Sequence, residues 1–179
     1  MQVTSVHITQ EKRNDSLDLL DETRDRLIDA IAGLTGQQAH AKPAPGRWSI
    51  AEILEHVVLL EMAFHSRVIP ALRTGPAPER DAETGDAMVR TRVPDRETKY
   101  QVPGPLAPTG RWNETECLRR FVDIRQRTIE FASNPAGFRE HTVDHPFLGP
   151  LDSYQWVLMV ALHSARHTAQ ILEVRQAIV

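Results

Sequence analysis

The sequence predicts an all-α protein, a four-helix bundle with a long crossover between its second and third helices. Four long stretches repeat apolar residues every three or four positions, and no stretch shows a convincing strand pattern. The chain has 179 residues, so we expect one domain over residues 1–179. With 41% hydrophobic and 25% charged residues, its composition is that of a globular protein and excludes a disordered one.

The first predicted helix covers residues 11–34. Its apolar positions recur at three- and four-residue spacing: Leu17, Leu20, Leu27, Ile28, Ile31 and Leu34. Gly33 and Gly36 can end this helix, because glycine readily adopts the left-handed conformation that closes a helix. Pro43 and Pro45 mark the connector that follows.

The second predicted helix has a clear start. Ser49 and Glu52 form a capping box, and Trp48 can pack on Ile53 as a hydrophobic staple. The apolar stripe then continues to about Leu72 through Ile53, Val57, Leu60, Phe64 and Val68.

Residues 73–110 are predicted as the crossover. They hold six of the twelve prolines and four of the nine glycines, with few apolar residues and no stable period. A short helix is predicted within them, over residues 79–92. A connection of this length is typical of a functional segment or of a chain that returns across the fold.

The third predicted helix begins at a capping pair, Asn113 with Glu116, and Trp112 can pack as a staple on Cys117. It ends at Asn134, and residues 135–150 are predicted as a loop. The fourth helix is predicted to begin at Asp152, with Gln155 completing a looser cap, and to continue to the C-terminus.

The charge balance excludes some partners. Twenty-one basic and 24 acidic residues give a net charge of −3 without a block of like charges, so we expect neither nucleic acid nor an anionic membrane as a partner. A single cysteine forms no internal disulfide. No apolar run resembles a signal peptide or a membrane span. These features predict a cytoplasmic protein.

Eight histidines are the unusual feature of the composition, and three of them indicate a site. His163 and His167 are four residues apart in the fourth helix, so both imidazoles leave one face, with about 5–6 Å between their Cβ atoms. One ion with metal–nitrogen bonds of about 2.0–2.1 Å can bridge two rings at that separation. Trp156 and Val160 lie on the same face, which predicts a seam that faces the core.

An alternative interpretation keeps these histidines in the core without a metal. Two buried imidazoles side by side cost free energy unless both stay neutral and hydrogen-bonded or share a cation. A third ligand favours the metal, and His56, at the edge of the apolar stripe of the second helix, can point into the bundle. Three histidines leave coordination positions open for water and substrate, which is the catalytic pattern.

Four short segments surround these histidines: Trp48-Ser49-Ile50, Glu52-Ile53-Leu54-Glu55-His56, the run from His145 to Leu151 (HPFLGPL), and the run from His163 to Gln170 (HSARHTAQ). Together they resemble the DinB superfamily, DNA-damage-inducible-like four-helix proteins that include YfiT-like metal-dependent hydrolases. The likeness covers nearly the whole chain in helix order and in the long link, whereas the first helix matches only in pattern.

The resemblance implies one divalent metal ion held by one histidine of the second helix and two of the fourth. Carried over to this sequence, the ligands are His56, His163 and His167. Nickel or zinc is the implied ion, with iron or manganese as alternatives. The resemblance also implies a homodimer, and either a hydrolase or a transferase of low-molecular-weight thiols such as bacillithiol, mycothiol or glutathione.

Residues beside these ligands have competing explanations. Glu52, one turn before His56, is a weak candidate proton acceptor, and its capping role already explains it. His145 can line the pocket or be a labile fourth ligand, although turn packing is the simpler explanation. Arg166 and Gln170 flank the ligands and can hold the second ring nitrogens.

Other residues receive structural explanations first. His65 is nine residues after His56, which turns it to the opposite helix face and predicts a surface position. Trp156 is expected as a core anchor that can border the substrate. Cys117, near a helix N-terminus, has no visible partner for a nucleophilic role. The basic crossover residues either bind an acidic substrate or lie solvated: Arg80, Arg90, Arg92, Arg96 and Lys99.

Three classes of function remain open from the sequence. In the first, a metal-dependent enzyme acts on a small molecule, because an ion on three neutral imidazoles can activate water for hydrolysis or hold a thiol as thiolate. In the second, a non-catalytic, stress-related metal-binding protein serves as a dimeric interaction scaffold. In the third, a metal-free bundle buries its histidines and loses no stability in chelator.

Overall fold

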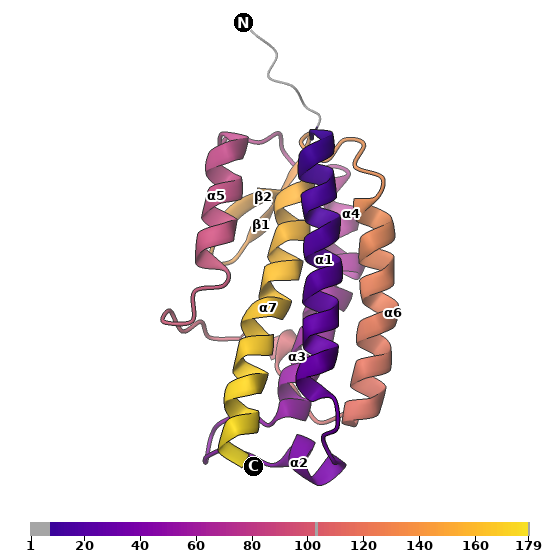
Figure 1. Cartoon of the computed structure of the whole chain (residues 1–179). Helices are drawn as coiled ribbons and strands as arrows, with labels where there is room; N and C mark the ends of the chain where they lie inside the picture. The colour runs from indigo at the N-terminus through magenta and orange to yellow at the C-terminus, as the bar shows by residue number, and fades with distance from the viewer. Residues whose placement is uncertain (1–7, 103, 179) are drawn as a thin grey trace, which may run out of the picture.

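The computed structural model describes residues 8–102 and 104–178. Four long helices form a bundle (Figure 1): α1 (Gln10–Ile31), α3 (Ile50–Ala63), α6 (Glu114–Ala132) and α7 (Ser153–Ile178). Helices α1 and α7 pack together and run in one direction, whereas α3 and α6 pack together and run in the other. The predicted all-α class and four-helix bundle are confirmed.

Helix α1 ends three residues before the predicted boundary. Its N-cap is Thr9, whose side chain accepts a hydrogen bond from the Lys12 N–H. Gly33 has φ +75°, the left-handed conformation that stops a helix at low cost only for glycine. A short helix, α2 (Gly36–His40), lies in the predicted connector.

The second predicted helix is one continuous rod with an irregular turn. The capping box of Ser49 and Glu52 starts α3, as predicted. A π-helical turn, η1 (Phe64–Val68), follows α3, and α4 (Ile69–Leu72) completes the rod up to the predicted end. Such turns are rare and frequently lie at functional sites.

The crossover returns the chain along the bundle. It contains α5 (Ala82–Arg92) and a 3₁₀ turn, η2 (Gly104–Leu106). Figure 1 shows α5 beside α7, and the crossover connects the end of the bundle that holds α4 to the opposite end, where α6 begins. Because α3 and α6 run in the same direction, the chain needs this return. The predicted short helix is confirmed, with Asp81 as its N-cap.

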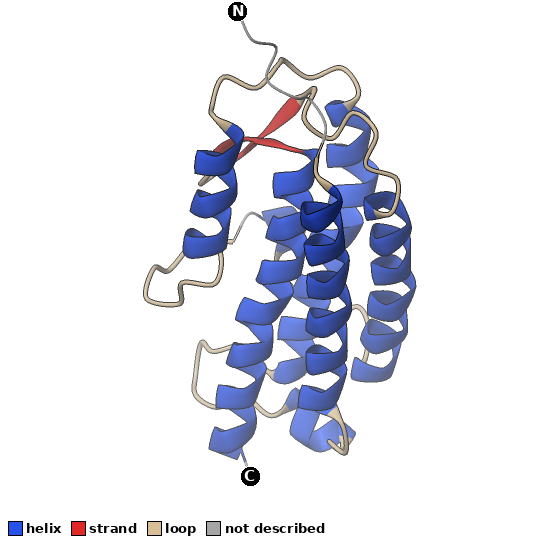
Figure 2. Ribbon diagram, turned by 45° about the horizontal axis from the view of Figure 1, so that its top comes forward, coloured by secondary structure: helices blue, strands red, loops and turns tan. Residues whose placement is uncertain are grey.

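The loop predicted over residues 135–150 is partly wrong. Its second half forms an antiparallel hairpin (red in Figure 2) of β1 (Thr142–His145) and β2 (Gly149–Asp152). Each strand has only four residues, and Pro150 has no N–H for the ladder, so neither strand shows a recognisable pattern.

The hairpin leads directly into α7 through a reciprocal cap. The Asp152 N–H donates to Gln155 Oε1 at 3.2 Å, and the Gln155 N–H donates to Asp152 Oδ1 at 2.9 Å. These two bonds satisfy donors that a helix start leaves without partners. The predicted cap is confirmed, and the helix begins one residue later, at Ser153.

A buried charged network joins the four long helices and is absent from the sequence prediction. Arg125 of α6, with 0% exposure, pairs with Glu61 of α3 at 2.8 and 3.0 Å. It also donates to Thr23 Oγ1 of α1 at 2.9 Å and to Ser164 Oγ of α7 at 2.7 Å. One guanidinium therefore fixes how α1, α3 and α7 meet around α6.

Across residues 8–102 and 104–178, no helix combines the length and the apolar character that a membrane span requires.

Candidate metal centre

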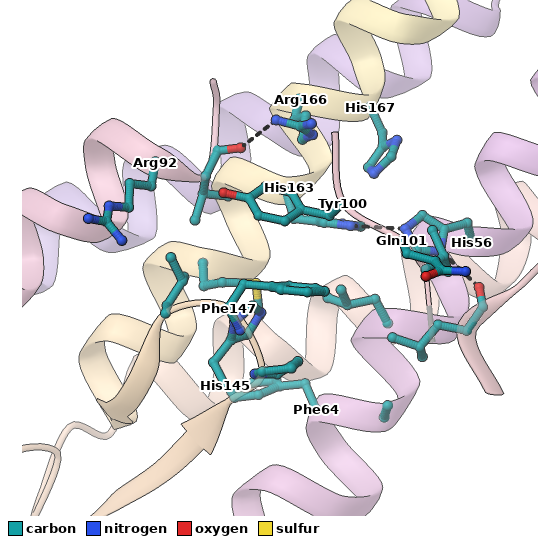
Figure 3. A pocket seen from close by; sticks show the side chains of 18 of the residues that line it. His56, Phe64, Arg92, Tyr100, Gln101, His145, Phe147, His163, Arg166 and His167 are labelled. Atoms are coloured by element: carbon teal, nitrogen blue, oxygen red, sulfur yellow. Dashed lines mark hydrogen bonds between the residues drawn. The ribbon is translucent and has the colours of Figure 1, made fainter. Parts of the chain in front are cut away.

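Three histidine rings from two helices meet between α3 and α7. His56 comes from α3, and His163 and His167 come from adjacent turns of α7 (Figure 3). One ring nitrogen of each residue lies within 4.8 Å of the other two. His56 Nε2 and His163 Nε2 are only 3.1 Å apart. The structure thus brings together the three residues that the sequence analysis selected.

Hydrogen bonds fix the tautomers of two of these rings. His56 Nδ1–H donates to the carbonyl oxygen of Leu106 at 2.8 Å. His167 Nδ1–H donates to Gln170 Oε1 at 2.8 Å. Since Nδ1 carries the proton in both neutral rings, Nε2 of each ring keeps its lone pair, as metal-bound histidines require.

His163 completes the set of nitrogen donors. Its Nε2 faces the Nε2 lone pair of His56, so a proton or a cation must lie between the two atoms. Its Nδ1 is buried and has no hydrogen-bond partner in the described part of the chain. Ligand nitrogens of a tetrahedral site lie about 3.3 Å apart, so small ring rotations suffice for the three nitrogens to share an ion. The residues present fit a divalent metal.

Burial keeps the three rings in the form that binds metal. It lowers the pKa of His56, lowers the pKa of His163 far below its usual value, and lowers the pKa of His167 to about 3. For His163 and His167 the neighbouring rings act in the same direction as burial. All three imidazoles are therefore neutral at pH 7, and binding a cation requires no loss of protons.

Glu55, the residue before His56, anchors the segment that orients the His56 ring. Its carboxylate is 1% exposed. Oε1 accepts hydrogen bonds from the Thr109 N–H at 3.0 Å and from Arg111 Nε at 3.1 Å, and Oε2 accepts from the Gly110 N–H at 2.7 Å. These residues follow η2, which contains Leu106. Sequence reasoning missed this role, although a carboxylate inside an apolar stripe is a signal that it needs buried donors.

The three rings line a cavity of about 590 Å³. Its walls come from α3, η1, α7, the hairpin turn and the crossover. Trp156 lines it, as expected, and its Nε1–H donates to the Val143 carbonyl at 3.2 Å. At the mouth, the rings of Tyr100 and Phe147 lie 4.7 Å apart between centroids, and both are partly exposed (Figure 3). The cavity has the size of a site for a small organic molecule.

The structure assigns other roles to several candidates. The Glu52 carboxylate accepts hydrogen bonds from the Ser49 N–H at 2.8 Å and from Lys42 Nζ at 2.9 Å, and it does not line the cavity. Its position is therefore explained by capping. Arg166 donates to the Thr98 carbonyl at 2.8 Å and holds the crossover, so of the two flanking residues only Gln170 contacts a ligand ring.

His145 lines the cavity and stands apart from the three-histidine cluster. Its Nδ1 accepts a hydrogen bond from the Phe147 N–H at 3.2 Å, and burial lowers its pKa to about 4. The ring is therefore neutral with its proton on Nε2. This hydrogen bond shows that His145 helps to hold the hairpin turn. The same ring also forms part of the cavity wall.

One expectation is wrong, and the burial of Cys117 agrees with another. His65 was expected on the surface, and this is wrong: it is half-buried, with Nε2 at 2.9 Å from Thr128 Oγ1 of α6. It does face away from His56 and stays outside the histidine cluster. Cys117 is fully buried, and burial followed by the nearby Glu55 charge raises its pKa to about 12, which excludes a reactive thiolate at neutral pH.

The basic residues of the crossover divide into two groups. Arg92, Arg96 and Lys99 line the cavity. Arg80 donates to the Leu148 carbonyl at 3.4 Å, and Arg90 pairs with Asp15, so these two hold the crossover against the rest of the fold.

Comparison with known proteins agrees with this architecture. YuaE of Bacillus subtilis strain 168, an uncharacterized protein, is 24% identical over 164 residues, which cover 90% of this chain and 98% of YuaE. YfiT from Bacillus subtilis, described as a probable metal-dependent hydrolase with an unusual four-helix bundle topology, superposes with a TM-score of 0.65 and 17% identity, covering 94% of this chain and 89% of YfiT.

The four-helix bundle protein TT2238 superposes with a TM-score of 0.51 and 19% identity, covering 90% of this chain and 98% of TT2238. Both structural likenesses concern the fold. The family model of the DinB superfamily matches residues 19–171, which include all three histidines of the cluster and the whole crossover. The chain belongs to the DinB superfamily.

Proposed function

We propose that this protein is a metal-dependent enzyme, most simply a hydrolase, that holds one divalent ion on His56, His163 and His167. The observation that carries the proposal is the pair of fixed tautomers: Leu106 and Gln170 hold the outer protons of the His56 and His167 rings, so Nε2 of each ring keeps its lone pair. One nitrogen of each of the three histidines lies within 4.8 Å of the other two. The three rings line the cavity. The description of YfiT as a probable metal-dependent hydrolase supports the same class.

A bound divalent ion supplies a fixed positive charge that activates water, or a thiol, as a nucleophile. The chain's own residues prepare the site for this chemistry. The Leu106 carbonyl and the Gln170 amide orient the rings, and the three protein ligands leave positions free for substrate. Trp156 and Phe64, stacked with ring centroids 6.3 Å apart, form an apolar wall that limits access of water.

Transfer of a low-molecular-weight thiol to an electrophile is the second candidate. The volume of the cavity, about 590 Å³, favours it, because hydrolysis of a small ester needs little more space than the ester itself. We propose nickel or zinc as the bound ion. We also propose a homodimer that works in the cytoplasm without nucleic acid.

Elemental analysis of the untagged protein tests the metal. We expect about one nickel, zinc, iron or manganese ion per chain, removed by mild chelation and lost in His163→Ala. Screening the loaded protein against ester, amide and thiol-transfer substrates then separates hydrolysis from transfer. Absence of metal after loading with each ion overturns the proposal and leaves a scaffold with buried histidines.

A further inference from the structure

The cavity wall carries more basic than acidic side chains, unlike the chain as a whole. Six basic side chains line it: Arg47, Arg67, Arg92, Arg96, Lys99 and Arg166. Asp144 is the one acidic residue among the lining positions that the structure describes. This excess of positive charge lies in a chain whose net charge is −3. A cleft lined by one sign of charge concentrates ligands of the opposite sign.

Two of the six already hold the structure in place. Arg96 donates to the Arg166 carbonyl at 3.0 Å and pairs with Glu173 at 2.5 Å. Arg166 donates to the Val93 and Thr98 carbonyls. Both guanidiniums therefore fix residues 93–98 of the crossover on α7. This structural role explains why Arg96 and Arg166 lie in the cavity wall.

The other four have no such role. Within residues 8–102 and 104–178, the side chains of Arg47, Arg67, Arg92 and Lys99 make no hydrogen bond or ion pair. Some exposed arginines elsewhere, such as Arg119, pair with neighbouring carboxylates. The four come from separate segments: the connector before α3, the π turn η1, the end of α5, and the crossover beyond it.

The remaining wall is apolar and aromatic. Tyr100 and Phe147 stand at the mouth, and Trp48 lies beside His56 with ring centroids 5.2 Å apart. Figure 3 shows Arg92 and His56 at opposite sides of this wall, with Tyr100 and Phe147 between them. A ligand that reaches from the histidines to the free cations therefore crosses an aromatic surface.

We infer that the substrate is an organic anion: a carboxylate or phosphate group that pairs with the free cations at the mouth, joined to a flat apolar body that lies between the aromatic rings, with its reacting end at the three histidines. This inference rests on the proposed function for the reacting end alone. The anionic group and the apolar body of the substrate are inferred from the basic and aromatic residues of the cavity, which are in place with or without the ion.

A matched pair of fluorescent probes tests the anion. 8-Anilinonaphthalene-1-sulfonate and N-phenyl-1-naphthylamine share one ring system, and only the first carries a charge. We expect the metal-loaded protein to bind the sulfonate more tightly, and the difference to shrink as salt is added. Arg67→Gln and Arg92→Gln should each weaken sulfonate binding about threefold and leave the neutral probe unchanged, the effect of one exposed ion pair.

Arg127→Gln is the matched control, because Arg127 is an exposed arginine of α6 that also makes no hydrogen bond or ion pair in the described residues and lies outside the cavity lining. It should leave both probes unchanged. Phe147→Ala removes part of the aromatic wall and should weaken both probes alike. Equal binding of the two probes by the native protein, or an equal effect of Arg127→Gln and Arg67→Gln, overturns the inference.

Competition with 2-naphthoate, 2-naphthyl phosphate and 2-naphthol then identifies the anion. If 2-naphthoate displaces the sulfonate probe at a lower concentration than 2-naphthyl phosphate does, the preferred group is a carboxylate; the reverse order indicates a phosphate. Displacement by neutral 2-naphthol at an equal concentration overturns the inference. Metal content measured on the same samples keeps the two proposals apart. Charge-selective binding without metal contradicts only the enzyme proposal, and metal without charge selectivity contradicts only the substrate class.

Discussion

His56 of α3 and Leu106 of the crossover are joined by a 2.8 Å hydrogen bond across fifty residues of chain, from the ring Nδ1–H to the backbone carbonyl. The carboxylate of Glu55, the adjacent residue, accepts hydrogen bonds from the backbone of Thr109 and Gly110 in the same segment. Two consecutive residues of one helix therefore hold one loop, and that loop orients the ring at the histidine cluster.

We predict that Glu55→Ala weakens metal binding although Glu55 is no ligand. Without the carboxylate, the loop that carries Leu106 loses its anchor, and the His56 ring loses its fixed tautomer. Loss of such a supporting contact typically costs about 10–100-fold in metal affinity. Competition titration with a chromophoric chelator measures the affinity, and the absorption spectrum of the cobalt form reports the ligand geometry.

Arg111→Gln is the control for this experiment. Arg111 contacts the same carboxylate at 3.1 Å but its side chain is 45% exposed, so we expect an affinity within about threefold of the native value. Native affinity and an unaltered cobalt spectrum in folded Glu55→Ala protein would contradict the role that we assign to Glu55.

The histidines themselves give the second prediction. His56→Ala, His163→Ala and His167→Ala should each lower metal occupancy, because each removes one of three nitrogens. His65→Ala should leave occupancy unchanged and reduce the free energy of unfolding by about 1 kcal/mol, the contribution of a typical hydrogen bond. Its bond goes to Thr128 of α6, whereas the cluster is formed by residues of α3 and α7. Loss of metal in His65→Ala would refute the placement of the site.

The third prediction concerns Gln170, whose Oε1 accepts from His167 Nδ1–H at 2.8 Å. Gln170→Leu keeps most of the volume and removes the acceptor, so we expect about 10–100-fold weaker metal binding. Gln170→Glu keeps an acceptor and should bind the ion at least as tightly as the native protein. Calorimetric titration with zinc measures both, and equal affinities for the leucine and glutamate variants would exclude a role for this hydrogen bond.

Much of the fold follows from local patterns in the sequence. The Ser49–Glu52 and Asp152–Gln155 caps and the stop at Gly33 were predictable, because each depends on a few neighbouring side chains. The same applies to His163 and His167, which helical spacing alone puts side by side. His56 reaches the other two histidines only through the packing of the bundle, so its prediction relied on the apolar stripe and on a family resemblance.

The missed features depend on contacts between distant segments. Leu106 contributes a backbone carbonyl, which no side-chain pattern marks, and Glu55 acts on residues more than fifty positions away. The hairpin escaped prediction because its strands are short and one contains Pro150. His65 was misplaced because polar contacts between η1 and α6, such as its contact with Thr128, leave no trace in an apolar periodicity.

The buried network gives the fourth prediction. Arg125→Met leaves the Glu61 carboxylate without its cation inside the bundle, and we expect a loss of about 3–5 kcal/mol in the free energy of unfolding. The double variant Glu61→Leu with Arg125→Met should recover much of that loss, because neither charge remains buried. Arg119→Met, at an exposed pair with Glu116, should change stability by less than about 0.5 kcal/mol. Urea denaturation measures all three, and equal losses for Arg119→Met and Arg125→Met would contradict the network.

The pH dependence of stability gives the last prediction. Burial lowers the pKa of His145 from 6.5 to about 4 in the folded protein. Between these pH values the unfolded chain binds a proton that the folded chain does not, so the free energy of unfolding falls as the pH drops below about 6.5. Above about pH 6.5 the contribution of His145 to stability is fully present. The buried rings of His56 and His167 act in the same sense when no metal is bound. Urea denaturation in chelator at pH 7.5, 6.5, 5.8 and 5.0 measures the slope in a range where most carboxylates stay ionised. We expect a shallower slope in His145→Gln, and an unchanged slope would show that His145 is not held neutral in the fold.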